Sequence, residues 1–322
     1  MGSGFIFALI PAISSFFIGQ GKVRLVTISV VTANILNVLF DVLFIFGVQG
    51  FIPEFGITGA AMATALASFI QAIILLSVFL NKKNRTQYQT QFASFDYSLF
   101  SKCIKIGAPN AFGHMFEILA WTIIMHILAS VGENYITVFS VGQGFFVLFS
   151  FMTDGLQKGV IVTVSNLLGS NNIKKVPKVL FSAFKMHLLF FLSIAIPCFF
   201  FPKFLVTQFL HISYSHFTTI SQETFDASIA SMSYVSLYFL VNGMIWIIAG
   251  VLVSTGKTVF ILLVNAVNAW LFAILPILVI KSLGYLELCT FWQVVIFYAS
   301  INFMVFSIRC MKGIWKENKV LV

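Results

Sequence analysis

Residues 57–80 read ITGAAMATALASFIQAIILLSVFL, a run without a single charged side chain. The hydrocarbon core of a bilayer is about 30 Å thick, and a helix rises about 1.5 Å per residue. A helix therefore needs roughly 20 mostly apolar residues to cross the membrane. This run meets both requirements, so it predicts a membrane-spanning helix.

The same pattern recurs along the whole chain of 322 residues. Of these residues 59% are hydrophobic and only 9% are charged, whereas a soluble domain has about 25% charged residues. The mean hydropathy is +1.00. We therefore expect an all-α polytopic membrane protein with about nine spanning helices. They are predicted at residues 3–19, 25–48, 57–80, 107–131, 135–168, 179–201, 227–254, 258–280 and 288–309.

The formal net charge of +9 could suggest nucleic acid as a partner. The basic residues, however, stand in short clusters between apolar runs, which is typical of cytoplasmic loops. With nine spans, 16 of the 19 Lys and Arg residues fall on one side of the membrane, and only Lys203 and Lys281 fall on the other. This asymmetry predicts a multi-pass protein of the inner (plasma) membrane with a cytoplasmic C-terminus, an external N-terminus and no nucleic-acid partner.

The predicted span at 25–48 carries three polar residues on one helical face. Asn34, Asn37 and Asp41 are spaced three and four residues apart. An acid flanked by two amides can hold a proton or a cation, because the amides supply oxygen ligands and burial favours the protonated acid. In the alternative interpretation, Asp41 lies near the helix end and the amides only bond a neighbouring helix.

The predicted span at 107–131 carries Glu117, ten residues beyond Gly107 and thus near mid-membrane. Ionisable groups at this depth are costly and usually functional, so Glu117 is a candidate for cation coupling or substrate binding. His114 lies one turn away on the same face, but a lone histidine more often hydrogen-bonds a neighbouring helix. Asp154 and Lys158, four residues apart, are interpreted as a self-neutralising pair.

Tyr238, Asn242 and Trp246 follow one another at intervals of four residues in the span at 227–254. Such a polar and aromatic stripe could contact a cationic ligand through hydrogen bonds and ring faces, or could simply pack between helices.

The sequence contains no pattern typical of an enzyme or of a resident metal. The four cysteines show no paired spacing, and no P-loop or zinc-protease motif is present. The histidines and acids between 201 and 226 do not follow a metal-binding spacing, so this segment is expected to be a solvated external loop. We expect a non-enzymatic protein without a cofactor.

The long polar stretch at 81–101 separates three predicted spans from six. GQGK at 19–22 and STGK at 254–257 also echo each other, and each is followed by an apolar segment with an asparagine pair. Repeated halves are typical of transporters. The sequence therefore predicts two pseudo-symmetric helical lobes, with the N-lobe at 1–80, a cytoplasmic linker at 81–101, the C-lobe at 102–312 and a cytoplasmic tail at 313–322.

Several segments resemble the MATE (multidrug and toxic compound extrusion) transporters, in particular the bacterial NorM-like and DNA-damage-inducible protein F types. GQGKVR, NILNVLFDVLFIFG and GITGAAMAT, between residues 19 and 64, resemble the fourth-to-sixth helix region of the family. IGAPNAFGHMFE, VSNLLGSNN and IAGVLVSTGKT follow in the family's order. The resemblance implies two six-helix lobes, a central cavity open alternately to either side, and export of organic cations by a monomer, driven by entry of H⁺ or Na⁺.

The resemblance also assigns roles to residues. Asn37, Asp41 and Thr64 match the N-lobe cation site, where Na⁺ could bind, and Asn34 is expected to join their network. Glu117 matches the seventh-helix acid. Asn242 stands where many Na⁺-type members carry aspartate, which favours an H⁺ or N-lobe mechanism. The candidate substrate-binding residues are His114, Glu117, Tyr238, Asn242 and Trp246.

Two alternatives remain open at this stage. Family members have twelve helices, so the nine predicted spans correspond to the fourth to twelfth, and a non-transporting remnant is one interpretation. A lipid-linked precursor flippase of the same superfamily is another, although it would need a more cationic cavity, and Lys158 is the only basic residue deep in a predicted span.

Overall fold

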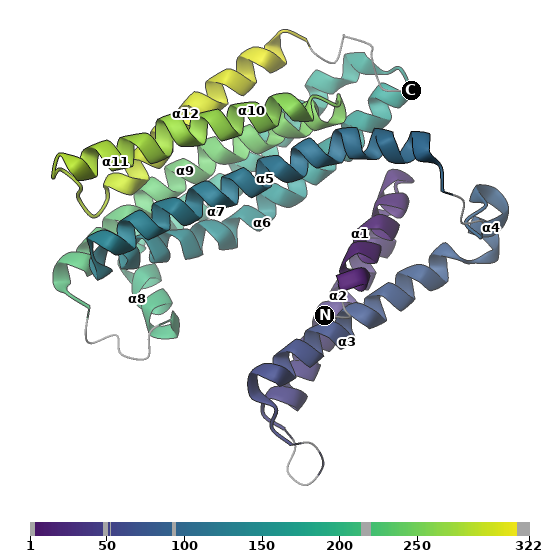
Figure 1. The fold of residues 1–322 in the computed structure, drawn as a ribbon, viewed down its shortest axis with the longest axis horizontal. Coiled ribbons are helices and arrows are strands. Elements are labelled where there is room, and N and C mark those ends of the chain that lie inside the picture. Colours follow the sequence, from purple (N-terminus) through teal and green to yellow (C-terminus); the bar gives the residue numbers. More distant parts are fainter. Residues whose placement is uncertain (1–3, 48–50, 52, 92–94, 214–219, 314–322) are drawn as a thin grey trace. The chain divides into compact units, whose positions relative to one another are not determined.

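The computed structural model describes all residues except 1–3, 48–50, 52, 92–94, 214–219 and 314–322. The described residues form helices joined by short connections, without β-strands (Figure 1). The predicted tail beyond Gly313 lies outside them. The elements are α1 (Gly4–Gly19), α2 (Val23–Ile45), α3 (Gly56–Phe79), α4 (Lys82–Tyr88), α5 (Tyr97–Val131), α6 (Glu133–Gly169), η1 (Ile173–Lys175), α7 (Val176–Phe200), α8 (Pro202–Ser213), α9 (Gln222–Ser254), α10 (Thr258–Ala269), η3 (Trp270–Ile274), α11 (Leu275–Ser282) and α12 (Thr290–Met311).

The prediction of an all-α polytopic membrane protein is confirmed. Among the described residues, eight helical segments are long and apolar enough to cross a membrane. α1 is a shorter apolar helix of 16 residues at the position of the first predicted span. The nine predicted segments therefore all correspond to helices.

Several segments differ from the prediction. α5 begins at Tyr97, ten residues before the predicted start, and α4 adds a short helix within the predicted linker. The expectation of a solvated loop at 201–226 is wrong for residues 222–226, which begin α9, and for residues 202–213, which form α8. The reason is that Val206 and Leu210, one turn apart, are both completely buried against the hydrophobic core. His216 lies outside the described residues.

The chain divides into two compact units, one up to Asp96 and one from Tyr97 onward. The boundary falls within the polar stretch at 81–101. The assignment of particular residue ranges to an N-lobe and a C-lobe stays a prediction.

The second unit is organised around α9. In the most apolar 18-residue window of α9, 72% of the residues are buried. The corresponding share in α6, the next most buried span, is 44%. α9 packs against α6, α7 and α12, and these long helices run side by side (Figure 1). Trp292 of α12 is completely buried at this core, stacked near Phe139 and in contact with Phe291. Gly142 makes room for it, because an added Cβ would collide with the indole ring.

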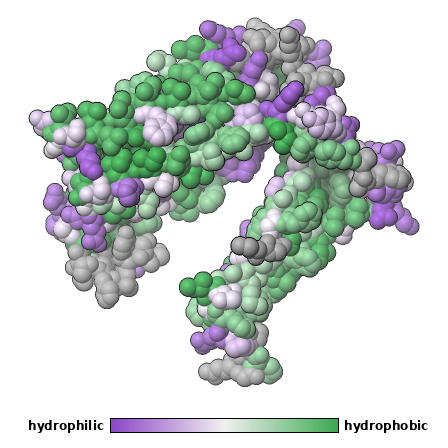
Figure 2. All heavy atoms as spheres, in the orientation of Figure 1, coloured by the Kyte–Doolittle hydropathy of each residue, from purple (hydrophilic) through white to green (hydrophobic). Residues whose placement is uncertain are grey.

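The first unit consists of α1, α2 and α3 with the short α4. Its small core contains Phe17, Val26 and Leu75. α2 is the least buried span, with only 11% of its window buried. In both units, apolar side chains cover the helix lengths and hydrophilic ones gather near the ends, as expected for segments that face lipid (Figure 2).

The two echoing segments of the sequence form the same turn. Gly21 and Gly256 have φ angles of +75° and +74°, in the left-handed region that favours glycine. The N–H of Lys22 donates to the carbonyl of Phe17 at 2.9 Å, and that of Lys257 donates to Leu252 at 3.0 Å. Each helix pair, α1–α2 and α9–α10, is thus joined by a glycine-terminated Schellman turn.

Candidate ligand-binding cavity

A polar cavity of about 200 Å³ lies inside the second unit. Five helices line it: α5, α6, α9, α10 and α12. More than half of the lining residues are polar, although each of these helices is predominantly apolar. The polar lining residues are Asn110, His114, Glu117, Asp154, Gln157, Lys158, Asn242, Asn265, Tyr298 and Asn302.

Helical spacing explains how apolar helices present this polar wall. On α5 the residues Asn110, His114 and Glu117 are four and three positions apart, so they share one face. Tyr298 and Asn302 of α12 are likewise one turn apart. α5 packs against α10 at Gly113, where an added Cβ would make an ordinary van der Waals contact with the Leu262 Cα at 3.6 Å.

Two carboxylates and one ammonium group face the cavity. The Nζ of Lys158 donates to Oδ2 of Asp154 at 2.6 Å, which confirms the predicted self-neutralising pair. The Nδ1 of His114 lies 3.6 Å from Oε2 of Glu117 and forms an ion pair with it only when the imidazole is protonated. With His114 neutral, the cavity carries a net charge of −1, contributed by Glu117.

A hydrogen bond between helices fixes part of the cavity wall. The amide of Asn268 on α10 donates to Oδ1 of Asn302 on α12 at 2.7 Å, and both residues are buried. This bond holds the Asn302 side chain at the cavity and joins α10 to α12. Asn265, one turn before Asn268, lines the cavity directly.

The structure brings four of the five predicted substrate-binding residues together at this cavity. His114 and Glu117 come from α5, and Asn242 and Trp246 from α9. Tyr238 does not line it. It is completely buried and its ring packs against Trp121 and Phe146. Its role in substrate binding stays a prediction.

Several lining residues were not among the sequence candidates. Asn110, Gln157, Tyr298 and Asn302 were not singled out, and Asp154 and Lys158 were interpreted only as a mutual pair. A usable signal was present, since Asn110 precedes His114 by one turn, and Tyr298 precedes Asn302 by one turn, within otherwise apolar helices.

A second, very small hollow of about 10 Å³ lies against Glu117 and Tyr298. Ala269 and Ala273 line it, and Ala273 belongs to η3, a π-helical segment between α10 and α11. Such segments are often found at functional sites. No pattern in the residues had indicated this irregularity.

In the first unit, the structure joins two of the four predicted coupling residues. The amide of Asn37 on α2 lies 3.5 Å from the hydroxyl of Thr64 on α3 and donates to it. Asp41 is half-buried one turn further along α2, and Asn34 is exposed one turn back. Among the described residues, no group of three or more His, Cys, Asp and Glu side chains is placed to hold a metal ion.

The fold and site together are those of a polytopic helical membrane protein with a polar cavity inside its helix bundle. A family model, MatE, matches residues 109–279, more than half of the chain. The protein therefore belongs to the MATE family of membrane transporters.

Individual relatives agree with this assignment. "Probable multidrug resistance protein NorM" of Thermotoga maritima is 24% identical over 98% of this chain. An "FAD transporter" of Shewanella oneidensis is 28% identical over 59% of it. The chain spans only 66% of the length of the first relative and 42% of the second.

Solved structures show the same fold. An outward-facing multidrug resistance MATE family transporter of the MOP superfamily matches 99% of this chain with a TM-score of 0.84, at 16% identity. A MOP superfamily transporter from Pyrococcus furiosus matches 97% of this chain with a TM-score of 0.83, also at 16% identity. The chain covers 68% and 67% of these two structures.

Proposed function

We propose that this protein exports organic, mostly cationic drugs or toxins by alternating access, driven by entry of H⁺ or Na⁺. Membership of the MATE family and the T. maritima relative support the export of drugs. The coupling is inferred from the position of Glu117, a half-buried carboxylate in the middle of α5 that lines the polar cavity. The protein would lie in the inner membrane with its C-terminus in the cytoplasm, and would work as a monomer.

Glu117 can couple substrate export to proton entry because its carboxylate can bind either the cationic substrate or a proton. As a carboxylate it attracts a cationic substrate, and once protonated it no longer does so. Lys158 neutralises Asp154, so Glu117 is the carboxylate of the cavity whose charge is left to act on a ligand. Protonation of Glu117 would thus favour release of the substrate on the side from which protons enter.

α9 would supply the other substrate contacts. Asn242 offers an amide for hydrogen bonds, and Trp246, four residues further along, offers a ring face to a cation. The amides of Asn110, Gln157 and Asn265 would offer a substrate further hydrogen-bond donors and acceptors in the same cavity. Such a wall suits ligands of varied shape, as expected of a multidrug exporter.

The network of Asn37, Asp41 and Thr64 is the proposed second coupling site, with Asn34 at its edge. The 3.5 Å contact of Asn37 with Thr64 and the position of Asp41 one turn away support it. Amide, hydroxyl and carboxylate oxygens suit a hard cation such as Na⁺, and the carboxylate also suits a proton. Each site biases the transporter only by its difference in affinity for the two conformations.

The cavity favours export of cations over the flipping of a lipid-linked pyrophosphate. A pyrophosphate ligand requires cationic groups that are free to bind it. Lys158 is the only Lys or Arg that lines the described cavity, and its ammonium group is engaged by Asp154 at 2.6 Å.

The proposal is tested by measuring ethidium export from bacterial cells that lack their own drug exporters and express this chain. We expect export that stops with a protonophore if H⁺ is the coupling ion, or on removal of Na⁺ if Na⁺ is. Glu117→Gln and Asp41→Asn should each lower the export rate by about tenfold or more, equivalent to about 1.4 kcal/mol. Glu223→Gln is the matched control, because Glu223 is exposed in the first turn of α9, away from the cavity.

Two outcomes would contradict the proposal. Equal ethidium accumulation with and without the wild-type chain, at confirmed membrane expression, would contradict the transport activity. Wild-type export by Glu117→Gln and Asp41→Asn would contradict their roles in coupling.

A further inference from the structure

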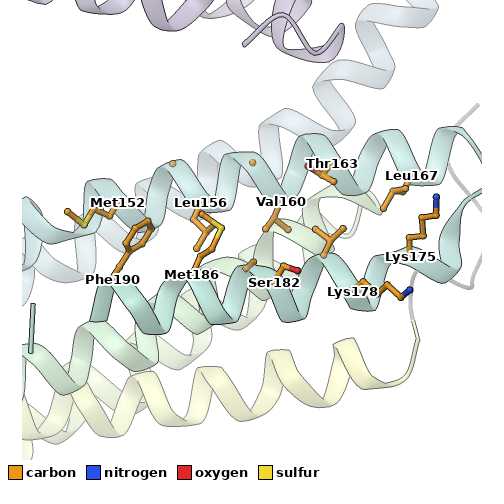
Figure 3. A pocket seen from close by; sticks show the side chains of 14 residues that line it. Met152, Leu156, Val160, Thr163, Leu167, Lys175, Lys178, Ser182, Met186 and Phe190 are labelled. Atoms are coloured by element: carbon orange, nitrogen blue, oxygen red, sulfur yellow. The ribbon is translucent and has the colours of Figure 1, made fainter. Parts of the chain in front are cut away.

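A long apolar groove of about 820 Å³ runs between α6 and α7, apart from the polar cavity (Figure 3). Its walls consist mainly of aliphatic, methionine and phenylalanine side chains. Figure 3 shows Met152, Leu156 and Val160 of α6 facing Met186 and Phe190 of α7 across it. None of the 14 described residues that line it is acidic.

Two glycines give the groove its depth. Gly155 and Gly159 lie one turn apart on the α6 side, and a Cβ added at either position would meet no atom within 4 Å. The space beside them is therefore open and is not filled by a neighbouring side chain. Gly142 differs, because its missing Cβ is replaced by the packed indole of Trp292.

Positive charge is confined to one end of the groove. Lys175 and Lys178 stand beside Leu167, whereas Met152 and Phe190 form the other end (Figure 3). Both lysines are exposed, and they lie in the segment that the charge asymmetry of the sequence places on the cytoplasmic side. Thr163 and Ser182 add hydroxyl groups in the half of the groove nearest the lysines.

The length of the groove matches one leaflet of a bilayer. From Met152 to Leu167, α6 rises about 22 Å at roughly 1.5 Å per residue. One leaflet, including its headgroup region, is about 20 Å thick. A lipid whose tail lies against the glycines would thus bring its phosphate to the level of Lys175 and Lys178.

We propose that this groove is a binding site for an anionic phospholipid of the cytoplasmic leaflet. One acyl chain lies along Leu156, Gly159 and Val160, and the two lysines bind the headgroup phosphate. The anionic headgroup follows from the charge complementarity, because two cations stand at the headgroup end and no acidic side chain among the described lining residues opposes them. The site is independent of the proposed transport function, since it shares no lining residue with the polar cavity.

The test is native mass spectrometry of the purified full chain titrated with phosphatidylglycerol or phosphatidylcholine of identical acyl chains. We expect the wild type to bind phosphatidylglycerol more tightly. Each lysine is expected to strengthen phosphatidylglycerol binding about fivefold, so the double variant Lys175→Gln with Lys178→Gln should weaken it by about 25-fold. The double variant should also lose the preference for phosphatidylglycerol over phosphatidylcholine. The matched control is Lys174→Gln with Lys185→Gln, two exposed lysines of the same segment that do not line the groove.

A second variant tests the tail. Gly159→Leu should weaken binding of both lipids, and it should fold because the added side chain enters open space. Circular dichroism and gel filtration check the fold of each variant. Equal binding of the two lipids by the wild type, or equal losses in the groove and control double variants, would overturn the proposal.

Discussion

Each unit of this protein joins two of its helices through an asparagine side chain, yet the two contacts differ. In the second unit, Asn268 donates to Asn302 at 2.7 Å, and both are buried, with 7% and 3% of their surfaces exposed. In the first unit, Asn37 reaches Thr64 at 3.5 Å, and Thr64 is exposed. The same type of residue thus forms a short, enclosed bond in one unit and a long, open one in the other.

The difference follows from how many helices surround each contact. α9 is buried over 72% of its window and provides a core around which α5, α6, α10 and α12 enclose polar groups, whereas α2 is buried over only 11%. Enclosed polar groups must be matched by protein partners, because neither lipid nor water replaces a lost bond. A partly exposed network can exchange its hydrogen-bond partners, which is compatible with the ion-coupling role proposed for Asn37, Asp41 and Thr64.

The largest effect is expected from Trp292→Ala, which removes the central side chain of the second unit. Trp292 is completely buried among Phe139, Tyr238 and Phe291. We expect the unfolding free energy to fall by about 3 kcal/mol. This value is at the low end for a buried tryptophan replaced by alanine, because the lipid around the protein is itself apolar. Unfolding in mixed detergent measures it. Ile35→Ala, at a residue 57% exposed on α2, is the control and should change stability little. Similar losses in both variants would contradict a stabilising role of the core around Trp292.

A smaller effect is expected for the pair of Asn268 and Asn302. A double-mutant cycle with alanine at each position should give a coupling of about 1.5 kcal/mol, near the upper end for hydrogen bonds between membrane helices. The coupling is large because either single substitution leaves the other amide buried without its partner. The same detergent unfolding measures it, and a coupling near zero would show that the 2.7 Å bond does not stabilise the bundle.

The smallest effect is expected for Asn37 and Thr64. The same cycle there should give a coupling below about 0.5 kcal/mol, because a 3.5 Å contact is long for a hydrogen bond, Thr64 is exposed and Asn37 is only half-buried. Asn37→Ala should nevertheless lower ethidium export, since the proposed role of Asn37 is to bind the coupling ion. A coupling as large as that of Asn268 and Asn302 would remove the contrast between the units.

Much of the fold could be predicted from sequence because membrane helices are specified locally. An apolar run such as residues 57–80 must satisfy its own backbone hydrogen bonds in lipid, so composition alone predicts its helix. α8 was missed because 12 residues are too few for a span, and its helical state depends on burying Val206 and Leu210 in the core. η3 was missed because a π-helical segment depends on packing rather than on composition.

The candidate site was predictable only in part, because the roles of most of its residues depend on packing between helices. Glu117 was identifiable because a carboxylate at mid-helix is unusual in any membrane span. Asn110, Tyr298 and Asn302 left only a weaker signal, their one-turn spacing, because an amide or a phenol within an apolar helix is common and its role depends on which residues face it. Tyr238 illustrates the reverse case. It shares a helical stripe with Asn242 and Trp246, but its ring is buried away from the cavity.

The sequence by itself determined the membrane-spanning helices, their order, the pair of Asp154 and Lys158 and the family, because each depends on residues close together in the chain. Only the tertiary structure decided that five helices close around a polar cavity, that Asn268 bonds Asn302, and that Gly155 and Gly159 open a groove while Gly142 receives an indole ring. These features depend on which faces of distant helices meet. Because the chain is so uniformly apolar, its residue pattern does not predict which helix faces meet, and the packing of side chains across the bundle determines this.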